Sequence, residues 1–171
     1  MDISKLSSGE NPENGQVNVF IEIPAGSSVK YELDKESGMI VVDRFLYTEM
    51  EYPFNYGFVP HTESGDGDPL DVLVLTSKPV VPGVVIAAKV IGMLETEDEK
   101  GPDTKIIAVP MEKTNPPFGK YNDVSELPKD VTESIKNFFE HYKEKEPGKW
   151  VKVSGWKGRE DAITAVKESI K

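Results

Sequence analysis

The most restrictive feature of this sequence is a series of short apolar runs separated by glycine and proline. At 17–23 apolar side chains alternate with polar ones, and Pro24 and Gly26 end the run; this alternation is typical of a half-buried strand. Gly92 lies inside a nearly continuous apolar run and predicts a bulge there. Strands so short and so numerous favour a barrel or a sandwich. Further strands are predicted at 29–33, 39–46, 72–75, 84–94 and 106–109.

The last third of the chain changes to a helical period, in which apolar residues return every three to four positions. It predicts a helix that ends before Pro147, a short strand at 150–153 and a second helix at 161–170. Many short strands followed by two helices predict an α+β fold, with helices packed against a small β-barrel. The apolar positions of the two predicted helices are Val131, Ile135, Phe138, Phe139 and Tyr142, then Ile163, Val166 and Ile170.

Length and charge narrow the possible partners. The chain has 171 residues without a repeat or a change of composition, so we expect one domain over 1–171. The longest uncharged stretch, 79–88, is much shorter than the ~20 residues that cross a bilayer, and residues 1–16 lack the apolar core of a signal peptide. A net charge of −10 opposes nucleic-acid binding. We therefore expect a cytoplasmic protein with neither membrane nor nucleic acid as partner.

The densest cluster of functional groups is the loop Asp66-Gly67-Asp68-Pro69-Leu70-Asp71. Carboxylates this close repel one another unless cations lie among them, and oxygen ligands select hard ions such as Mg²⁺ or Ca²⁺. An EF-hand is excluded, because its sixth position requires glycine and here holds Asp71. An Asp-rich surface turn would have the same composition. The apolar strand that follows at once favours a site at a fixed strand end.

Other charged residues lie in loops or in apolar strands where they could serve a site, although each could also be an ordinary surface charge. A second acidic group spans 95–99 and includes Asp98, with Asp103 following; such a group is also typical of a solvated loop. Lys30, Arg44 and Lys105 begin or interrupt apolar strands, and for each one taken alone an outward-facing strand charge is the favoured interpretation. Arg44 is one of only two arginines, and its planar fork suits phosphate oxygens. Tyrosine hydroxyls, several of which lie in an aromatic stretch at 52–61, can also donate to phosphate.

The acidic loop and seven further segments of the chain, in their order and spacing, resemble the soluble inorganic pyrophosphatases of the prokaryotic type. The resemblance extends from about residue 17 to 171 and rests most on the Asp-Gly-Asp-Pro-x-Asp loop. The other matching segments are Glu22-Ile23-Pro24, Lys30-Tyr31-Glu32, Val42-Asp43-Arg44-Phe45, Tyr52-Pro53-Phe54-Asn55-Tyr56-Gly57, Phe138-Phe139-Glu140-His141-Tyr142-Lys143, Lys149-Trp150-Val151-Lys152-Val153 and Gly155-Trp156.

The resemblance implies an OB-like five-stranded β-barrel with flanking α-helices, assembled as a homohexamer. It implies hydrolysis of pyrophosphate to two orthophosphates by a metal-activated water, in line and without a covalent intermediate, with several Mg²⁺ ions per subunit. Asp68 would be the general base, and Asp71 would bridge two of the ions. The other implied roles are metal binding by Glu22, Asp66, Asp71, Asp98 and Asp103, phosphate binding by Lys30, Arg44, Tyr56, Lys105, Tyr142 and Lys143, and support of the site by Glu32 and Tyr52.

Two other classes share parts of this pattern. A non-catalytic domain that binds divalent cations would have the acidic loops, but it gives no reason for Lys30, Arg44 and Lys105 to interrupt apolar strands. An OB-type nucleic-acid binder would have the barrel, but the chain has no basic stripe and carries strong negative charge.

Overall fold

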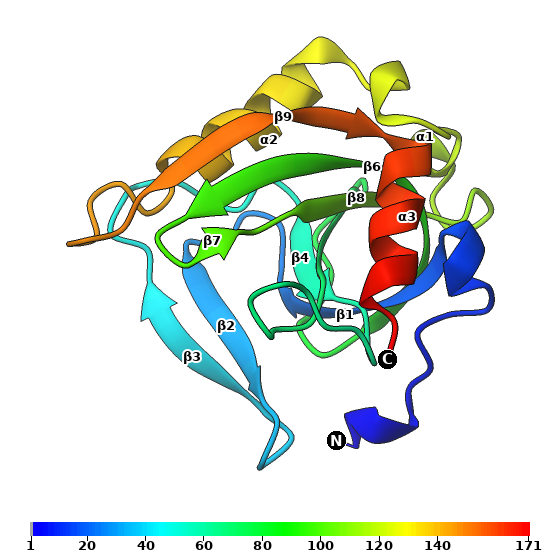
Figure 1. Cartoon of the computed structure of the whole chain (residues 1–171), viewed down its shortest axis with the longest axis horizontal. Helices are drawn as coiled ribbons and strands as arrows, with labels where there is room; N and C mark the ends of the chain where they lie inside the picture. Colours follow the sequence, from blue (N-terminus) through cyan, green and yellow to red (C-terminus); the bar gives the residue numbers. More distant parts are fainter. Residues whose placement is uncertain (1) are drawn as a thin grey trace.

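The computed structural model describes residues 2–171, and a ring of five strands lies at its centre (Figure 1). The last pairing returns to the first strand, so the ring closes into a barrel. All neighbours are antiparallel except β5 and β8. The predicted five-stranded OB-like barrel and the α+β class are therefore confirmed. In ring order the strands are β1 (Gln16–Ile23), β4 (Asn55–Phe58), β5 (Asp71–Val74), β8 (Lys105–Pro110) and β6 (Val85–Asp98).

Four further strands extend or accompany the ring. β7 (Gly101–Pro102) and β9 (Val151–Gly158) both pair with β6. β2 (Val29–Asp34) and β3 (Met39–Phe45) pair only with each other, and Figure 1 shows this hairpin projecting away from the barrel. The hairpin brings its charged residues over one end of the barrel without being part of the ring.

The helices lie outside the strands. The two long ones are α2 (Lys129–His141), which packs against β9, and α3 (Arg159–Ser169), which packs against β6 (Figure 1). Both predicted helices are confirmed, although α3 begins two residues earlier than expected. No helix in residues 2–171 is long and apolar enough to cross a membrane. The shorter helices are η1 (Ile3–Lys5), η2 (Pro12–Asn14), α1 (Pro116–Gly119) and η3 (Val124–Glu126).

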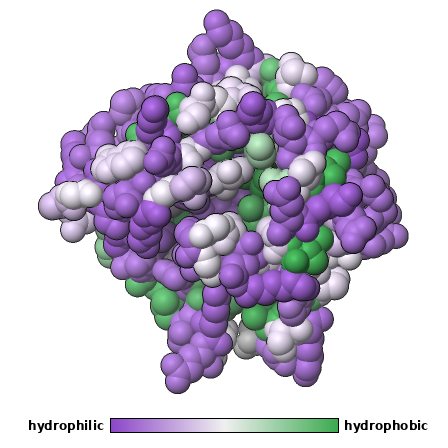
Figure 2. Space-filling view, in the orientation of Figure 1, coloured by the Kyte–Doolittle hydropathy of each residue, from purple (hydrophilic) through white to green (hydrophobic). Residues whose placement is uncertain are grey.

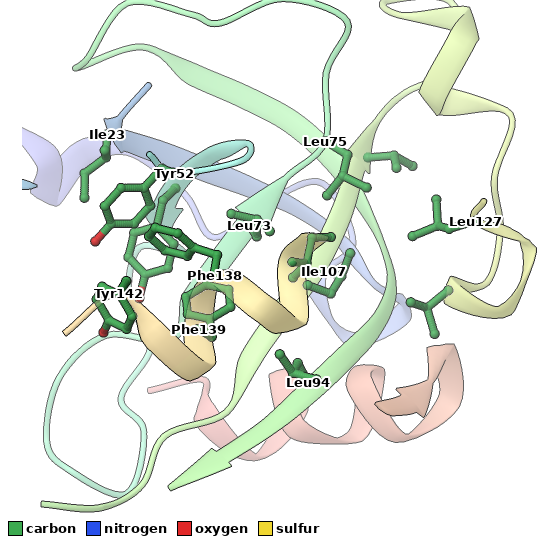
Figure 3. Packing of buried hydrophobic residues seen from close by; sticks show 14 of the residues in the cluster. Ile23, Tyr52, Leu73, Leu75, Leu94, Ile107, Leu127, Phe138, Phe139 and Tyr142 are labelled. Carbon is green, nitrogen blue, oxygen red and sulfur yellow. The ribbon is translucent and has the colours of Figure 1, made fainter. Parts of the chain in front are cut away.

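The main core joins the barrel to α2. Leu73 and Ile107 from the barrel and Phe138 and Phe139 from α2 are almost completely buried together (Figure 3). At one end of this cluster Tyr52 and Tyr142 point their hydroxyl oxygens away from the aliphatic residues (Figure 3). A second cluster fills the space between the barrel and α3. Burial of this apolar surface is the main force that fixes the strand ends around the site.

The strand predictions were correct in position and differ mainly at their ends. β4 was missed, because its four residues lie in an aromatic stretch with Pro53 before them and Gly57 inside. β6 and β9 run further than expected, to Asp98 and Gly158. The irregularity predicted at Gly92 is present as a register shift between β6 and β8. Three more shifts, at Glu22 in β1, at Asp43 in β3 and at Ser154 in β9, were not expected.

Hydrophilic side chains cover most of the face shown in Figure 2, with small apolar patches between them. Some of these patches lie at the lower left, where Figure 1 shows the β2–β3 hairpin. On β3 the side chains of Met39, Val41, Val42 and Phe45 are exposed. Apolar side chains on both faces of β3 are therefore uncovered in the single chain.

Candidate active site

Strand pairing brings distant charged residues to one end of the barrel. β5 and β8 run in parallel with Val72 opposite Ile106, so Asp71 and Lys105, which begin the two strands, lie side by side. β6 is antiparallel to β8, and its final residues therefore reach the same end, where Asp98 is its last residue. The end of β1 lies there too, next to Tyr56 in β4.

All fourteen residues predicted for the site line a single cavity of about 190 Å³. This volume corresponds to roughly six water molecules at about 30 Å³ each, which is suitable for a small anion with its ions. The fourteen come from seven strands, three loops and the end of α2. The fourteen are Glu22, Lys30, Glu32, Arg44, Tyr52, Tyr56, Asp66, Asp68, Asp71, Asp98, Asp103, Lys105, Tyr142 and Lys143.

Lys105 is the buried centre of the cavity. Its ammonium donates to Asp71 Oδ2 at 2.7 Å, to Asp103 Oδ2 at 2.7 Å and to Tyr56 Oη at 2.8 Å, which engages all three of its protons. Burial alone would lower the pKa of Lys105, but the acidic groups around it raise its pKa well above the usual value. Lys105 therefore stays charged although its side chain is only 4% exposed.

Glu22 lies in the bulge of β1, between Ile21 and Ile23, and the break in the ladder turns its side chain toward the cavity. Glu22 Oε1 accepts a hydrogen bond of 2.8 Å from the Leu33 amide, which ties the β2–β3 hairpin to the barrel. Burial, reinforced by the charge of Asp71, raises the pKa of Glu22 to about 7. This carboxylate is therefore poised to ionise when a cation arrives.

The acidic loop is held by its own polar groups. Ser64 Oγ donates to Asp66 Oδ1 at 2.7 Å, and the Asp68 amide donates to the same oxygen at 3.0 Å. Gly67, between the two aspartates, has φ +86°, a conformation that favours glycine. The Asp68 side chain forms no hydrogen bond within the part of the chain that the structure describes. Its carboxylate is left available at the cavity.

The β2–β3 hairpin contributes two cations that share one carboxylate. Lys30 Nζ lies 3.2 Å and Arg44 Nη1 2.6 Å from Asp43 Oδ2. Asp43 is the extra residue of the β3 bulge, since Tyr31 pairs with Val42 and Lys30 with Arg44. The bulge therefore places Lys30 and Arg44 opposite each other with an acid between them.

The end of α2 provides the opposite wall. Lys143 Nζ lies 3.0 Å from Asp98 Oδ2 and 3.6 Å from Glu99 Oε2. Burial opposes ionisation of Asp98, but its hydrogen bond to Lys143 lowers the pKa of Asp98 below the usual value. Burial also raises the pKa values of Tyr52, Tyr56 and Tyr142. Their hydroxyls keep their protons and can donate to phosphate oxygen.

The donor set fits hard divalent cations. Burial raises the pKa of Asp103, and the charge of Asp71 adds to this against the opposing effect of Lys105. Such repulsion among carboxylates is relieved by a cation, and oxygen donors match Mg²⁺. In residues 2–171 no three acidic or histidine side chains converge as a ready cage. Lys105 lies between Asp71 and Asp103, and Asp66 is turned toward its own loop.

Several cavity residues were not assigned a role from the sequence. Glu99, Lys100 and Lys149 line the rim, and Lys149 Nζ lies 3.3 Å from Glu99 Oε1. Glu99 was visible as part of the acidic group at 95–99, and Lys149 as part of a matching segment. Glu146, which contacts Arg44 from outside the cavity, had no local signal, because it precedes a Pro-Gly turn that indicates only the end of a helix.

An OB-like barrel with carboxylates and cations gathered around a small cavity at one end is the arrangement expected of an enzyme that acts on a small, highly charged anion. Residues 19–171 match the family described as inorganic pyrophosphatase. The chain therefore belongs to the inorganic pyrophosphatase family.

The inorganic pyrophosphatase of Aquifex pyrophilus is 56% identical over 170 residues, which cover 99% of this chain and 96% of that protein. The inorganic pyrophosphatase of Saccharolobus solfataricus is 54% identical over 166 residues, with 97% of this chain and 96% of that protein covered. A solved structure of an inorganic pyrophosphatase from Coxiella burnetii matches with a TM-score of 0.92 at 47% identity, and the match covers 96% of this chain and 98% of that one. Sequence and fold thus agree over nearly the whole chain.

Proposed function

We propose that this chain hydrolyses inorganic pyrophosphate to two orthophosphates, by in-line attack of water and without a covalent intermediate. The observation that carries the proposal is the convergence, on one cavity, of five carboxylates suited to metal binding and six groups able to donate to phosphate oxygen. Membership of the inorganic pyrophosphatase family supports the same reaction.

Magnesium is the proposed cofactor, with several ions in each subunit. The carboxylates that would hold it are Glu22, Asp66, Asp71, Asp98 and Asp103, and Asp71 would bridge two ions. When bound, magnesium lowers the pKa of a coordinated water and neutralises phosphate charge.

Asp68 is the proposed general base, which accepts the proton of the attacking water on a carboxylate oxygen. Support comes from its place on the cavity wall and from the freedom of its side chain within residues 2–171. A carboxylate base contributes typically 10²–10⁴-fold. Gly67 and the Ser64 hydrogen bonds hold the loop, so Asp68 needs little rearrangement to act.

The phosphate oxygens would receive hydrogen bonds from donor groups on opposite walls. Lys30 and Arg44 come from the hairpin, whereas Lys143 and Tyr142 come from the end of α2. Charge neutralisation and positioning account for most catalysis of phosphoryl transfer. Lys105 and Tyr56 would hold the substrate from the barrel side, and Glu32 and Tyr52 would support the walls.

The deciding experiment is phosphate release from pyrophosphate with purified protein in magnesium, repeated with EDTA in excess. We expect rapid release that stops with EDTA and returns when magnesium is restored. Absence of release in magnesium, with the protein folded by circular dichroism, would refute the proposal.

The proposed assembly is a homohexamer in the cytoplasm, without membrane or nucleic-acid partners. The exposed apolar residues of β3, with Tyr47 and Trp150, support association with further copies of the chain. Sedimentation velocity should give the mass of six subunits, and a monomer at micromolar concentration would contradict it.

A further inference from the structure

Glu146 is a buried acid on the loop that follows α2, behind the cavity wall. Its side chain is 7% exposed, and its Oε1 lies 2.9 Å from Arg44 Nε. Its other oxygen, Oε2, has no hydrogen-bond partner among residues 2–171. A buried carboxylate is costly unless a cation compensates it, and Arg44 is the cation that the described chain places beside it.

Arg44 is held on two sides by carboxylates. Glu146 flanks Nε, Asp43 Oδ2 lies 2.6 Å from Nη1, and the residue also lines the cavity. Burial lowers the pKa of Arg44, but Glu146 and then Asp43 raise its pKa above the usual value. Nη1 donates to Asp43, whereas Nε lies at ion-pair distance from Glu146 without a hydrogen bond among residues 2–171. The two carboxylates together restrict the orientation of the planar guanidinium electrostatically and leave Nη2 able to face a phosphate.

The same contact joins two segments that carry phosphate-binding groups. Arg44 belongs to the hairpin, whereas Glu146 lies on the loop that begins with Tyr142 and Lys143. The Glu146 amide donates to the Lys143 carbonyl at 3.0 Å, so Lys143 and Glu146 belong to one tight turn. The ion pair therefore sets the spacing between opposite walls of the cavity.

We propose that Glu146 is a positioning residue for substrate binding. It orients Arg44 and holds the hairpin at a fixed distance from Lys143. The inference rests on the proposed function of the cavity as a pyrophosphate site, and it adds a residue outside the cavity lining to the machinery that binds the substrate.

The test is a double-mutant cycle of Glu146→Ala and Arg44→Ala. Glu146→Ala alone should raise KM about tenfold, with a smaller change in kcat, because loss of one charged contact corresponds to about this factor. In the Arg44→Ala background the same change should alter KM less than about twofold, because there is no guanidinium left to orient. Equal effects in both backgrounds would overturn the proposal, and so would an unchanged KM in the single variant.

Glu146→Gln covers the case in which the alanine variant does not fold. It keeps the shape and one acceptor oxygen but removes the charge, so we expect an intermediate rise in KM that again disappears in the Arg44→Ala background. Glu144→Ala is the matched control, since this exposed acid on the same loop pairs with His141 away from the cavity; its KM should match that of the unmodified chain.

A binding measurement separates this inference from the proposed function. Imidodiphosphate, a non-hydrolysable analogue of pyrophosphate, is titrated calorimetrically in magnesium into each variant of the cycle. If the unmodified chain binds the analogue but releases no phosphate from pyrophosphate, the proposed reaction fails while the cycle still tests Glu146. If the chain hydrolyses pyrophosphate but the binding effects of the two changes simply add, the positioning role fails alone.

Discussion

The ammonium of Lys105 lies 2.7 Å from the carboxylate of Asp71, although 34 residues separate the two in the sequence. The parallel pairing of β5 with β8 causes this contact, because it aligns the first residues of both strands. The same ammonium reaches Asp103, so one lysine supplies the positive charge between two proposed metal ligands. A change at Asp71 or Asp103 would therefore also alter the surroundings of this buried charge.

Asp71→Asn should reduce pyrophosphate hydrolysis by about 100-fold or more, because a bridging ligand loses its charge; even changes to groups that support metal ligands cost 10–100-fold. Phosphate release at saturating magnesium measures the loss. Asp130→Asn, an exposed change at the start of α2, is the control and should keep full activity. An Asp71→Asn enzyme with normal turnover would remove Asp71 from the proposed metal site.

Asp68→Asn should lower kcat by 10²–10⁴-fold while leaving stability nearly unchanged, because the variant has lost a proton acceptor but no hydrogen bond of the loop. The pH dependence of kcat and the thermal unfolding midpoint are the two measurements. Retention of the original rate and pH profile would assign the base elsewhere.

Arg44→Lys should raise KM about tenfold, because an ammonium cannot reproduce the planar fork that contacts Asp43, Glu146 and phosphate together. Steady-state kinetics at fixed magnesium gives the value. Lys113→Arg is the control for a substitution between lysine and arginine, because Lys113 does not line the cavity. Unchanged kinetics in Arg44→Lys would show that the fork is not needed.

Glu22 should make the metal-free protein less stable as pH rises. Its pKa in the folded chain is about 7 against an ordinary 4.5, so between these values the folded state binds more protons and stability falls with increasing pH. Above pH 7 the ionised carboxylate costs up to about 3 kcal/mol.

Glu22→Gln in EDTA should therefore increase the free energy of unfolding at pH 8, with little effect near pH 4.5. Urea unfolding at the two pH values measures this difference, and Glu133→Gln on the exposed face of α2 is the control. A stabilisation independent of pH would argue against a raised pKa for Glu22.

Much of the fold was predictable because alternation and helical spacing are local signals. Val17 to Ile23 and the apolar stripe of α2 depend only on which side chains must be buried. β4 was not predictable in this way, because Pro53 and Gly57 argue against a strand. Its place between β1 and β5 depends on a ring of pairings formed by segments far apart in the sequence.

The candidate site could be named residue by residue only through resemblance to a family. Composition and spacing left an acidic surface turn as an equal alternative for the Asp-rich loop, and they favoured outward-facing strand charges for Lys30, Arg44 and Lys105. The pairing of Lys105 with Asp71 and of Arg44 with Glu146 depends on tertiary contacts over many residues, and no local pattern encodes it. Strand order, rather than motif spacing, is the physical reason that these groups meet.

The bulges at Glu22 and Asp43 make this site depend on chain length as well as on residue type. Each bulge adds one residue without a partner in the facing strand, and the pairs on both sides of it are in register. Deletion of Glu22 or Asp43 would therefore leave a regular ladder that lacks the carboxylate presented by the bulge. Loss of one residue at either position would both straighten the strand and remove an acid of the site, so relatives that keep the activity should keep the length of both strands at these points.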